Sequence, residues 1–221
     1  MSEQLSSWKD WLATHKAGQS IAFFLIMPLG ALFPPIGALL ILIWKFITRT
    51  PFKALGVSLP PNWAVLLLKG LLFGIVLKLT FKAVIMPPLG ADAVNTSFQF
   101  IAGRLDMALG LGLYVVFAAG ICEEVVFRGF FFSQLQKWLG QSRQSRWIII
   151  FSSSLVFGLP HLYQGPHGAF QAGLIGILFG IIYYRKNGNL WFLMIAHAAF
   201  DVCSVFLIYH QLETQVAQWL W

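Results

Sequence analysis

Residues 109–128 of the chain are LGLGLYVVFAAGICEEVVFR, an apolar run that ends in two adjacent glutamates and an arginine. Apart from three glycines, residues 109–122 are all Leu, Tyr, Val, Phe, Ala, Ile or Cys. Such a run favours a transmembrane helix, in which an ionisable group costs about 2.5 to 3.5 kcal/mol on insertion scales. We therefore interpret Glu123 and Glu124 as parts of a functional site, with partners elsewhere in the chain.

The composition of the whole chain also indicates a membrane protein. Of its 221 residues, 58% are hydrophobic and only 10% are charged, whereas soluble domains are about 45–50% apolar and about 25% charged. The net charge of +7 is scattered among apolar runs, so membrane topology explains it better than nucleic-acid binding. We expect an integral, multi-pass protein, typical of a bacterial cytoplasmic membrane, with no nucleic-acid partner.

Six stretches are apolar and long enough to cross a bilayer, which takes about 20 residues. They lie near 20–44, 62–86, 107–132, 146–162, 169–184 and 190–210. The first contains Pro28 and the Pro34-Pro35 pair, so it is either one kinked span or two short helices. The predicted fold is an all-α, polytopic bundle of about six to seven spans. Its parts are an N-terminal amphipathic segment (1–19), an N-terminal transmembrane part (20–104) and a catalytic transmembrane core (105–210).

Positive charge orients this bundle. Lysines and arginines gather in the first, third and fifth connections, which the positive-inside rule places in the cytoplasm. The side of the N-terminus stays open, because it depends on how residues 20–44 cross the membrane. Residues 7–16 begin with a Ser-x-x-Asp capping pattern and predict a short interfacial helix.

The glutamate pair divides into two roles on a regular α-helix. Glu124 and Arg128 are four residues apart and about 40° apart around the helix, so they are expected to pair. An unpaired charge in this setting would be strongly unfavourable. Glu123 points about 100° away from Glu124 and is expected to face the bundle interior, where burial favours a role in proton transfer.

Two further spans carry polar groups that lipid does not favour. The fourth span ends in FGLPH, which places Phe157 four residues before His161 and Pro160 between them. The sixth span holds His197 and Asp201, again four residues apart within an apolar segment. Each pair alone has a purely structural explanation. Together with the glutamates they form a set of carboxylates and imidazoles that is typical of a hydrolytic site.

These three motifs, EEVVFR, FGLPH and HAAFD, resemble the signature motifs of the CPBP family of intramembrane endopeptidases, which includes the CAAX-prenyl-protease-type (Abi) and bacteriocin-processing proteins. The resemblance covers about residues 105–205. It implies that Glu123 and His161 activate the attacking water, and that His197 and Asp201 polarise the scissile carbonyl or stabilise the oxyanion. Glu124 completes the catalytic set, and Arg128 and Phe157 support it.

The resemblance leaves the cofactor open between two options. One is a zinc ion held by Glu123, His161 and His197, with an open fourth position. The other is a metal-free glutamate mechanism. The motif ends in Asp201 rather than asparagine, and an anionic aspartate would orient or charge His197 rather than donate to an oxyanion.

Three functions therefore follow as hypotheses. The leading one is an intramembrane endopeptidase that cuts a membrane-embedded or lipidated protein or peptide, CAAX-like or other. The second is a non-catalytic membrane scaffold or bacteriocin-immunity protein. The third is a small transporter, for which the lysines of the second span, Lys69, Lys78 and Lys82, are the main support and the lack of an inverted repeat is the main objection. Lys78 and Lys82 share a helix face and would either snorkel or bind a substrate carboxylate.

Overall fold

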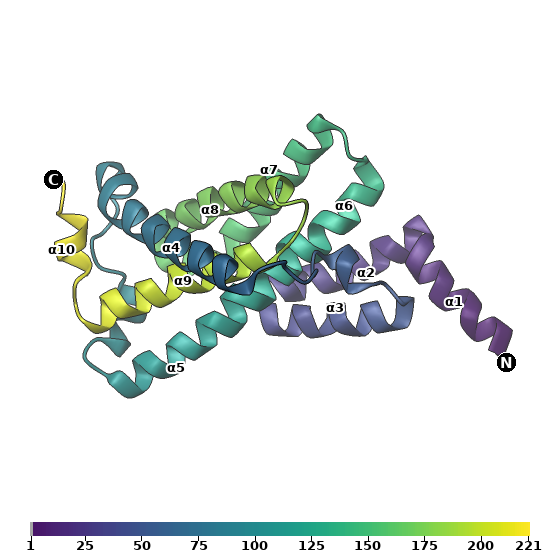
Figure 1. Cartoon of the computed structure of the whole chain (residues 1–221), viewed down its shortest axis with the longest axis horizontal. Coiled ribbons are helices and arrows are strands. Elements are labelled where there is room, and N and C mark those ends of the chain that lie inside the picture. Colours follow the sequence, from purple (N-terminus) through teal and green to yellow (C-terminus); the bar gives the residue numbers. More distant parts are fainter. Residues whose placement is uncertain (1) are drawn as a thin grey trace.

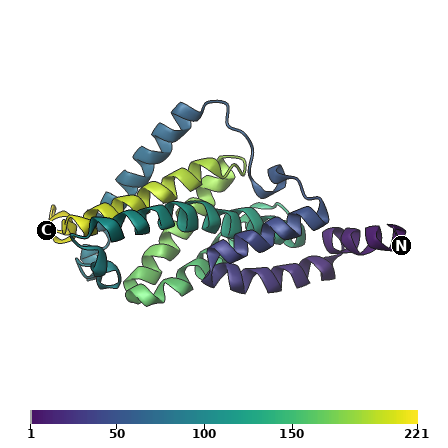
Figure 2. The same cartoon turned by 90° about the horizontal axis from the view of Figure 1, so that it is seen from below.

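A computed structural model describes residues 2–221, which form an elongated helical bundle with the two termini at opposite ends (Figures 1 and 2). The α-helices are α1 (Ser2–Thr14), α2 (Lys16–Leu32), α3 (Pro34–Thr48), α4 (Trp63–Thr80), α5 (Leu105–Val115), α6 (Phe132–Leu139), α7 (Arg143–Gly158), α8 (Gly165–Arg185), α9 (Trp191–Tyr209) and α10 (Glu213–Ala217). The tighter or wider helical turns are η1 (Phe52–Leu55), η2 (Phe81–Ile85), η3 (Pro87–Leu89), η4 (Thr96–Ile101), η5 (Val116–Glu123), η6 (Val125–Phe131) and η7 (Leu159–Gln164).

Within residues 2–221, four continuous helical segments are long and apolar enough to cross a membrane. They are Trp63–Ile85, Leu105–Leu139, Arg143–Arg185 and Trp191–Tyr209. The third is the predicted fourth and fifth spans together, because α7 and α8 are joined through η7 and pack against each other. The predicted all-α, polytopic fold is confirmed, and the predicted spans after residue 60 each correspond to one of these helices or helix pairs.

The predicted first span is two helices. α2 and α3, of 17 and 15 residues, are each shorter than the roughly 20 residues of a straight span, and they pack side by side. The break falls at Phe33, since the residue before a proline is disfavoured in the α conformation and Phe33 lies outside the helical region at φ −135° and ψ 78°. Pro28, by contrast, lies inside α2 without ending it.

The N-terminal helix begins earlier than the sequence pattern indicates. α1 starts at Ser2, so Ser7 lies inside the helix and is not its N-cap, and the predicted capping box is wrong. The helix ends before His15, whose imidazole instead caps α2 by accepting from the backbone N–H of Ala17. Trp11 stacks on His15 with ring centroids 5.5 Å apart. Helix α1 projects away from the bundle at the N-terminal end (Figure 1).

The helix that carries the glutamates is not a regular α-helix. α5 continues into two π-helical turns, η5 and η6, on either side of Glu124, before α6 restores α-helical winding. Because π-helical bonds run from residue i to i+5, fewer degrees separate successive side chains than in an α-helix. The assumed 100° between Glu123 and Glu124 is therefore too large. Such turns are frequently found at functional sites.

Helix α9 forms the centre of the bundle. Of the apolar 18-residue stretch in α9, 50% is buried inside the protein, whereas the corresponding stretch of Trp63–Ile85 is only 17% buried. It packs against α4 on one side and against α5 and η5 on another, as both views show (Figures 1 and 2). The motif residues His197 and Asp201 are therefore held on the innermost helix, next to the glutamates.

The close contact of α4 with α9 depends on two glycines. Gly70 and Gly74 are four residues apart, a spacing that lets helix backbones approach closely in membranes. A Cβ atom on Gly70 would lie 2.6 Å from Cγ2 of Ile195, and one on Gly74 would lie 2.7 Å from Cβ of Ala199 and also meet the carbonyl oxygen of Ala196.

Enlarging Gly74 is therefore expected to destabilise the protein. We predict that Gly74→Val lowers the free energy of unfolding by about 1–3 kcal/mol, because the helices must move apart or strain. Gly110→Val is the control, since no atom of the described chain lies within 4 Å of a Cβ at that position. Thermal unfolding in detergent checks this, and equal midpoints for the two variants would contradict it.

Candidate active site

A buried ion pair anchors the site. Nη1 of Arg128 donates to Oε1 of Glu124 at 3.0 Å, and the exposed fractions of the two side chains are 1% and 0%. The guanidinium lies over the rings of Phe157 and Phe179, with its carbon 4.7 Å and 5.6 Å from their centroids. The pairing predicted from the i,i+4 spacing is present despite the π-helical turns. The aromatic rings shield it from water, which strengthens the electrostatic attraction.

Glu124 also fixes the orientation of His197. Nδ1 of His197 lies 2.7 Å from Oε1 of Glu124, the same oxygen that Arg128 contacts. Since a carboxylate only accepts, Nδ1–H is the donor. The ring of Phe179 stands perpendicular to the imidazole at 5.5 Å between centroids. This contact leaves Nε2 of His197 as the nitrogen that faces the rest of the site.

Nε2 of His197 is flanked by two more carboxylates. Oε2 of Glu123 lies 3.8 Å away and Oδ2 of Asp201 lies 3.7 Å away. Both distances exceed a direct hydrogen bond. Oε2 of Glu123 is buried and makes no hydrogen bond within residues 2–221. Glu123 is thus the carboxylate of the pair without a fixed partner, as the sequence predicts.

His161 is held by its own helix. Its Nδ1 lies 2.8 Å from the carbonyl oxygen of Phe157. A carbonyl only accepts, so Nδ1 carries the proton, and Nε2 of the neutral ring is left with its lone pair. The position follows from the local fold: α7 ends at Gly158, and Pro160 and His161 lie in the 3₁₀ turn η7 that leads into α8. The proline therefore marks a change of direction, rather than a kink within one span.

One cavity collects these groups. Its volume is about 460 Å³, and its walls come from α2, α3, α4, η4, the glutamate helix, α7, η7, α8 and α9. The motif residues that line it are Glu123, Phe157, His161, His197 and Asp201. Glu124 and Arg128 are not among the lining residues and lie behind the cavity wall. Apolar side chains make up most of the remaining lining, together with Lys78, Asn95, Tyr163, Gln164, Gln171 and Ser204.

The sequence motifs did not point to two features of this site. Phe179, which contacts both Arg128 and His197, lies in an unremarkable apolar stretch of α8, and no local pattern distinguishes it from its neighbours. Lys78 of α4 shares the cavity with the motif residues. Its spacing from Lys82 drew attention to it, but only the fold shows which of the two lysines reaches the cavity.

The donor atoms bear on the zinc option. Among residues 2–221, no three His, Cys, Asp or Glu side chains lie together as a set that could hold a metal ion. As they lie, Glu123, His161 and His197 are therefore not a preformed set of three zinc ligands. A zinc requirement stays a prediction, to be tested on the purified protein.

Comparisons with known proteins agree with the motifs. Residues 106–203 match the family described as Type II CAAX prenyl endopeptidase Rce1-like, a range that includes every motif residue of the cavity. An uncharacterized protein of Mycoplasma capricolum subsp. capricolum is 32% identical over 97 residues, which are 43% of this chain and 26% of that relative. The matched part is thus about a quarter of the relative's length. No solved structure matches the chain. Residues 106–203 are thus similar to the Rce1-like family of type II CAAX prenyl endopeptidases, in a match that spans less than half of the chain.

Proposed function

We propose that the protein is an intramembrane endopeptidase that hydrolyses a peptide bond of a membrane-associated protein or peptide. One observation carries this proposal: the unpartnered buried oxygen of Glu123 lies in a cavity that His161, His197 and Asp201 also line. A scaffold has no physical need for such an oxygen, because a buried polar atom without a partner is costly. A substrate that is lipidated or membrane-embedded fits the largely apolar cavity wall.

In the proposed reaction, Glu123 is the general base. It removes a proton from a water molecule, whose oxygen then attacks the carbonyl carbon of the scissile bond. Nε2 of His161, with its lone pair, accepts a hydrogen bond from the other O–H group of that water. This contact orients the water molecule for attack. The proton held by Glu123 passes to the departing nitrogen when the C–N bond breaks. The balance is closed, since one water is consumed and a carboxylic acid and an amine are formed.

His197 is proposed to stabilise the negative oxygen of the tetrahedral intermediate. Its Nδ1–H is held by Glu124, so that a protonated ring directs Nε2–H into the cavity. Asp201, 3.7 Å from Nε2, favours this charged form. Asp201 is therefore proposed to act on His197 as a charge partner, rather than as a direct donor to the oxyanion. Preorganised donors of this kind contribute strongly because they need no rearrangement during the reaction.

Whether the enzyme needs zinc can be decided by measuring the metal content of the purified protein. If zinc were bound, it would supply a polarised, more acidic water. Metal analysis of purified, active protein distinguishes the two options. Activity in protein that contains no zinc would exclude the zinc option. Loss of activity with a chelator, and its return with one equivalent of zinc, would establish it.

Comparison of membrane proteomes tests the function itself. Cells that express the wild-type chain should contain peptide termini that are missing when Glu123→Gln replaces it at equal abundance. The non-catalytic scaffold is the alternative, and it makes the opposite prediction. If Glu123→Gln restored the phenotype of a deletion strain and no terminus depended on Glu123, the endopeptidase proposal would be wrong.

His161 offers a second prediction with a matched control. We expect His161→Ala to lower the cleavage rate at least about a hundredfold, because the water loses its acceptor while the general base remains. His210→Ala should keep the wild-type rate, since His210 is exposed at the C-terminal end of α9 and does not line the cavity. Equal rates for both variants in a purified assay would show that His161 has no part in catalysis.

A further inference from the structure

We propose that Lys78 binds a carboxylate of the substrate, and that the protein thereby selects peptides with a negative charge close to the bond that is cut. The inference rests on the proposed function, because it adds a specificity residue to the same cavity. Lys78 lies outside the segment that matches the family, on α4. The argument begins with the three lysines of this helix and its π-helical extension, which the fold sorts into three different settings.

Two of these lysines are accounted for, because one is exposed and the other forms an ion pair. Lys69 is exposed, as expected for a side chain that reaches the membrane surface. Lys82 is half-buried and forms an ion pair with Glu213 of α10 at 3.2 Å. It also donates to the carbonyl oxygen of Ala93. Neither lysine needs an external anion.

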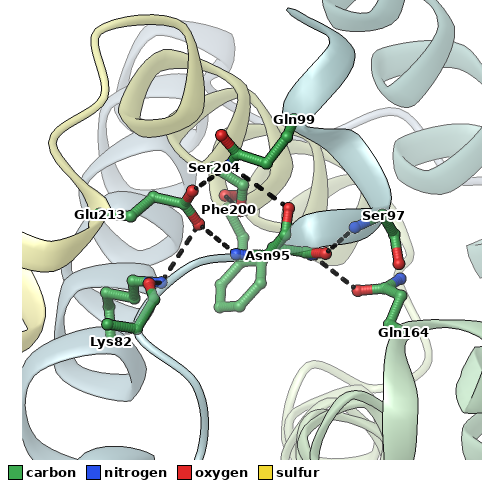
Figure 3. A network of polar contacts seen from close by, with 9 residues as sticks. Lys82, Asn95, Ser97, Gln99, Gln164, Phe200, Ser204 and Glu213 are labelled. Atoms are coloured by element: carbon green, nitrogen blue, oxygen red, sulfur yellow. Dashed lines mark hydrogen bonds and ion pairs between the residues drawn. The ribbon is translucent and has the colours of Figure 1, made fainter. Parts of the chain in front are cut away.

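The carboxylate of Glu213 is fully engaged within the protein. Besides Lys82, its oxygens accept from the backbone N–H of Asn95 at 3.1 Å and from Nε2 of Gln99 at 2.8 Å (Figure 3). The side chain of Asn95 in turn donates to Gln164 at 3.2 Å, in the turn that carries His161 (Figure 3). This network ties α10, Asn95 and η4 to η7. Because its acid is already neutralised, the network provides no counter-ion for a further lysine.

Lys78 has neither a counter-ion nor open surroundings. Within the described chain it makes no ion pair and no hydrogen bond with an acidic side chain, and its ammonium lies 5.0 Å from the ring centroid of Phe200. Phe200 directly precedes Asp201 on α9 and also lines the cavity. A half-buried ammonium in a membrane segment is unfavourable without a partner. An anion that arrives with the substrate would supply that partner.

The position of Lys78 suits a carboxylate next to the reacting groups. Lys78 lines the 460 Å³ cavity that contains Glu123 and His161, and it also lines a neighbouring cavity of about 160 Å³. Residues that line both cavities form their common border: Lys78, Asn95, Gln164, Gly168, Gln171, Ser204 and Ile208. The smaller cavity has room for roughly five water molecules at about 30 Å³ each. The charged end of a departing peptide would lie there, with Lys78 and the border amides as donors.

The acidic side chains near Lys78 do not pair with it, so its ammonium can bind a substrate carboxylate. Asp201 is directed at His197, 3.7 Å from its Nε2. Glu213 is paired with Lys82, and Asp92, which lines the smaller cavity, is exposed. The substrate carboxylate has two sources, a C-terminal α-carboxylate or an acidic side chain. Both offer the same chemistry to an ammonium, so the experiment must separate them.

Binding to the full-length Glu123→Gln protein in detergent tests the inference without cleavage. The probes are the fluorescently labelled tripeptide Leu-Leu-Phe as the free acid and as the C-terminal amide. Leu-Leu-Asp amide and Leu-Leu-Asn amide, which differ only in a side-chain charge, test the second source. We expect a carboxylate-bearing probe to bind about tenfold to a hundredfold more tightly than its neutral counterpart, as for a hydrogen bond to a charged group.

Variants of α4 identify the lysine responsible. In the Glu123→Gln background, Lys78→Met should remove the preference for the acid, Lys78→Arg should retain most of it, and Lys69→Met should leave it unchanged. Preference for Leu-Leu-Phe acid alone assigns the site to a C-terminus, and preference for Leu-Leu-Asp amide alone assigns it to an acidic side chain. Equal binding of acid and neutral probes, or a preference that survives Lys78→Met, overturns the inference.

The two proposals fail separately in these measurements. If wild-type protein produces Glu123-dependent termini but acid and neutral probes bind equally well, only the proposed role of Lys78 is wrong. If Lys78-dependent binding of the acid is present but no terminus depends on Glu123, the endopeptidase proposal is wrong and the anion site stands.

Discussion

Replacing Glu123 with glutamine is expected to reduce peptide-bond cleavage by about a hundredfold to ten-thousandfold, the usual contribution of a general base. Glutamine keeps the size and shape of the side chain but cannot take a proton from water. The protein should fold as before, since Oε2 of Glu123 makes no hydrogen bond within residues 2–221 that the substitution would remove. Rates of purified wild-type and variant protein, with thermal unfolding midpoints for both, measure the two effects separately.

A second carboxylate of the same helix serves as the control. Asp106 has a 71% exposed side chain and a loose contact of 3.6 Å with Arg104, so Asp106→Asn should retain the wild-type rate. A Glu123→Gln protein that cleaves as fast as Asp106→Asn would mean that Glu123 is not the base.

Loss of the buried cation should have the largest effect on stability. We expect Arg128→Met to lower the free energy of unfolding by about 3–5 kcal/mol, because it leaves Glu124 buried without its arginine. The contact of Glu124 with His197 remains in this variant, but the imidazole would have to carry the whole compensating charge. Unfolding midpoints in detergent should therefore fall markedly, together with the cleavage rate.

A double variant separates charge from packing. In Glu124→Gln/Arg128→Met the buried charge is gone, and the glutamine oxygen still accepts from Nδ1 of His197. This protein should be more stable than Arg128→Met alone, because neutral groups are tolerated where a lone charge is not. If the double variant were no more stable than Arg128→Met, the cost of losing Arg128 would come from lost packing against Phe157 and Phe179 rather than from an unpaired charge.

Much of the site could be predicted from the sequence for two reasons. Some of its contacts are local in the chain, and its ionisable side chains are strongly disfavoured in lipid. The i,i+4 spacing of Glu124 and Arg128 was enough to predict their contact. The presence of His161, His197 and Asp201 on apolar segments was enough to predict that they meet Glu123, since such groups are excluded from the lipid face. Glu123, His161, His197 and Asp201 do line one cavity, and the ion pair of Glu124 with Arg128 lies behind its wall.

The features that the sequence did not provide depend on packing between distant segments. The π-helical turns around Glu124 have no local sequence signature, and they changed the angle between the glutamates. Phe179 became relevant only because α8 packs beside the glutamate helix. The close approach of α4 to α9 required Gly70 and Gly74 to face that helix, which the four-residue spacing allows but does not specify. The split of residues 20–44 into α2 and α3 was one of two options, and Phe33 before Pro34 decided it.

The most direct test of the account is to follow a solvent oxygen. The proteome comparison first identifies a substrate and its cut site. Purified protein in lipid vesicles then cleaves this substrate in water enriched in oxygen-18. The account predicts one oxygen-18 atom in the new C-terminal carboxylate with the wild-type chain, and no new terminus with Glu123→Gln. Equal formation of that terminus by the two proteins would contradict the claim that Glu123 activates the attacking water.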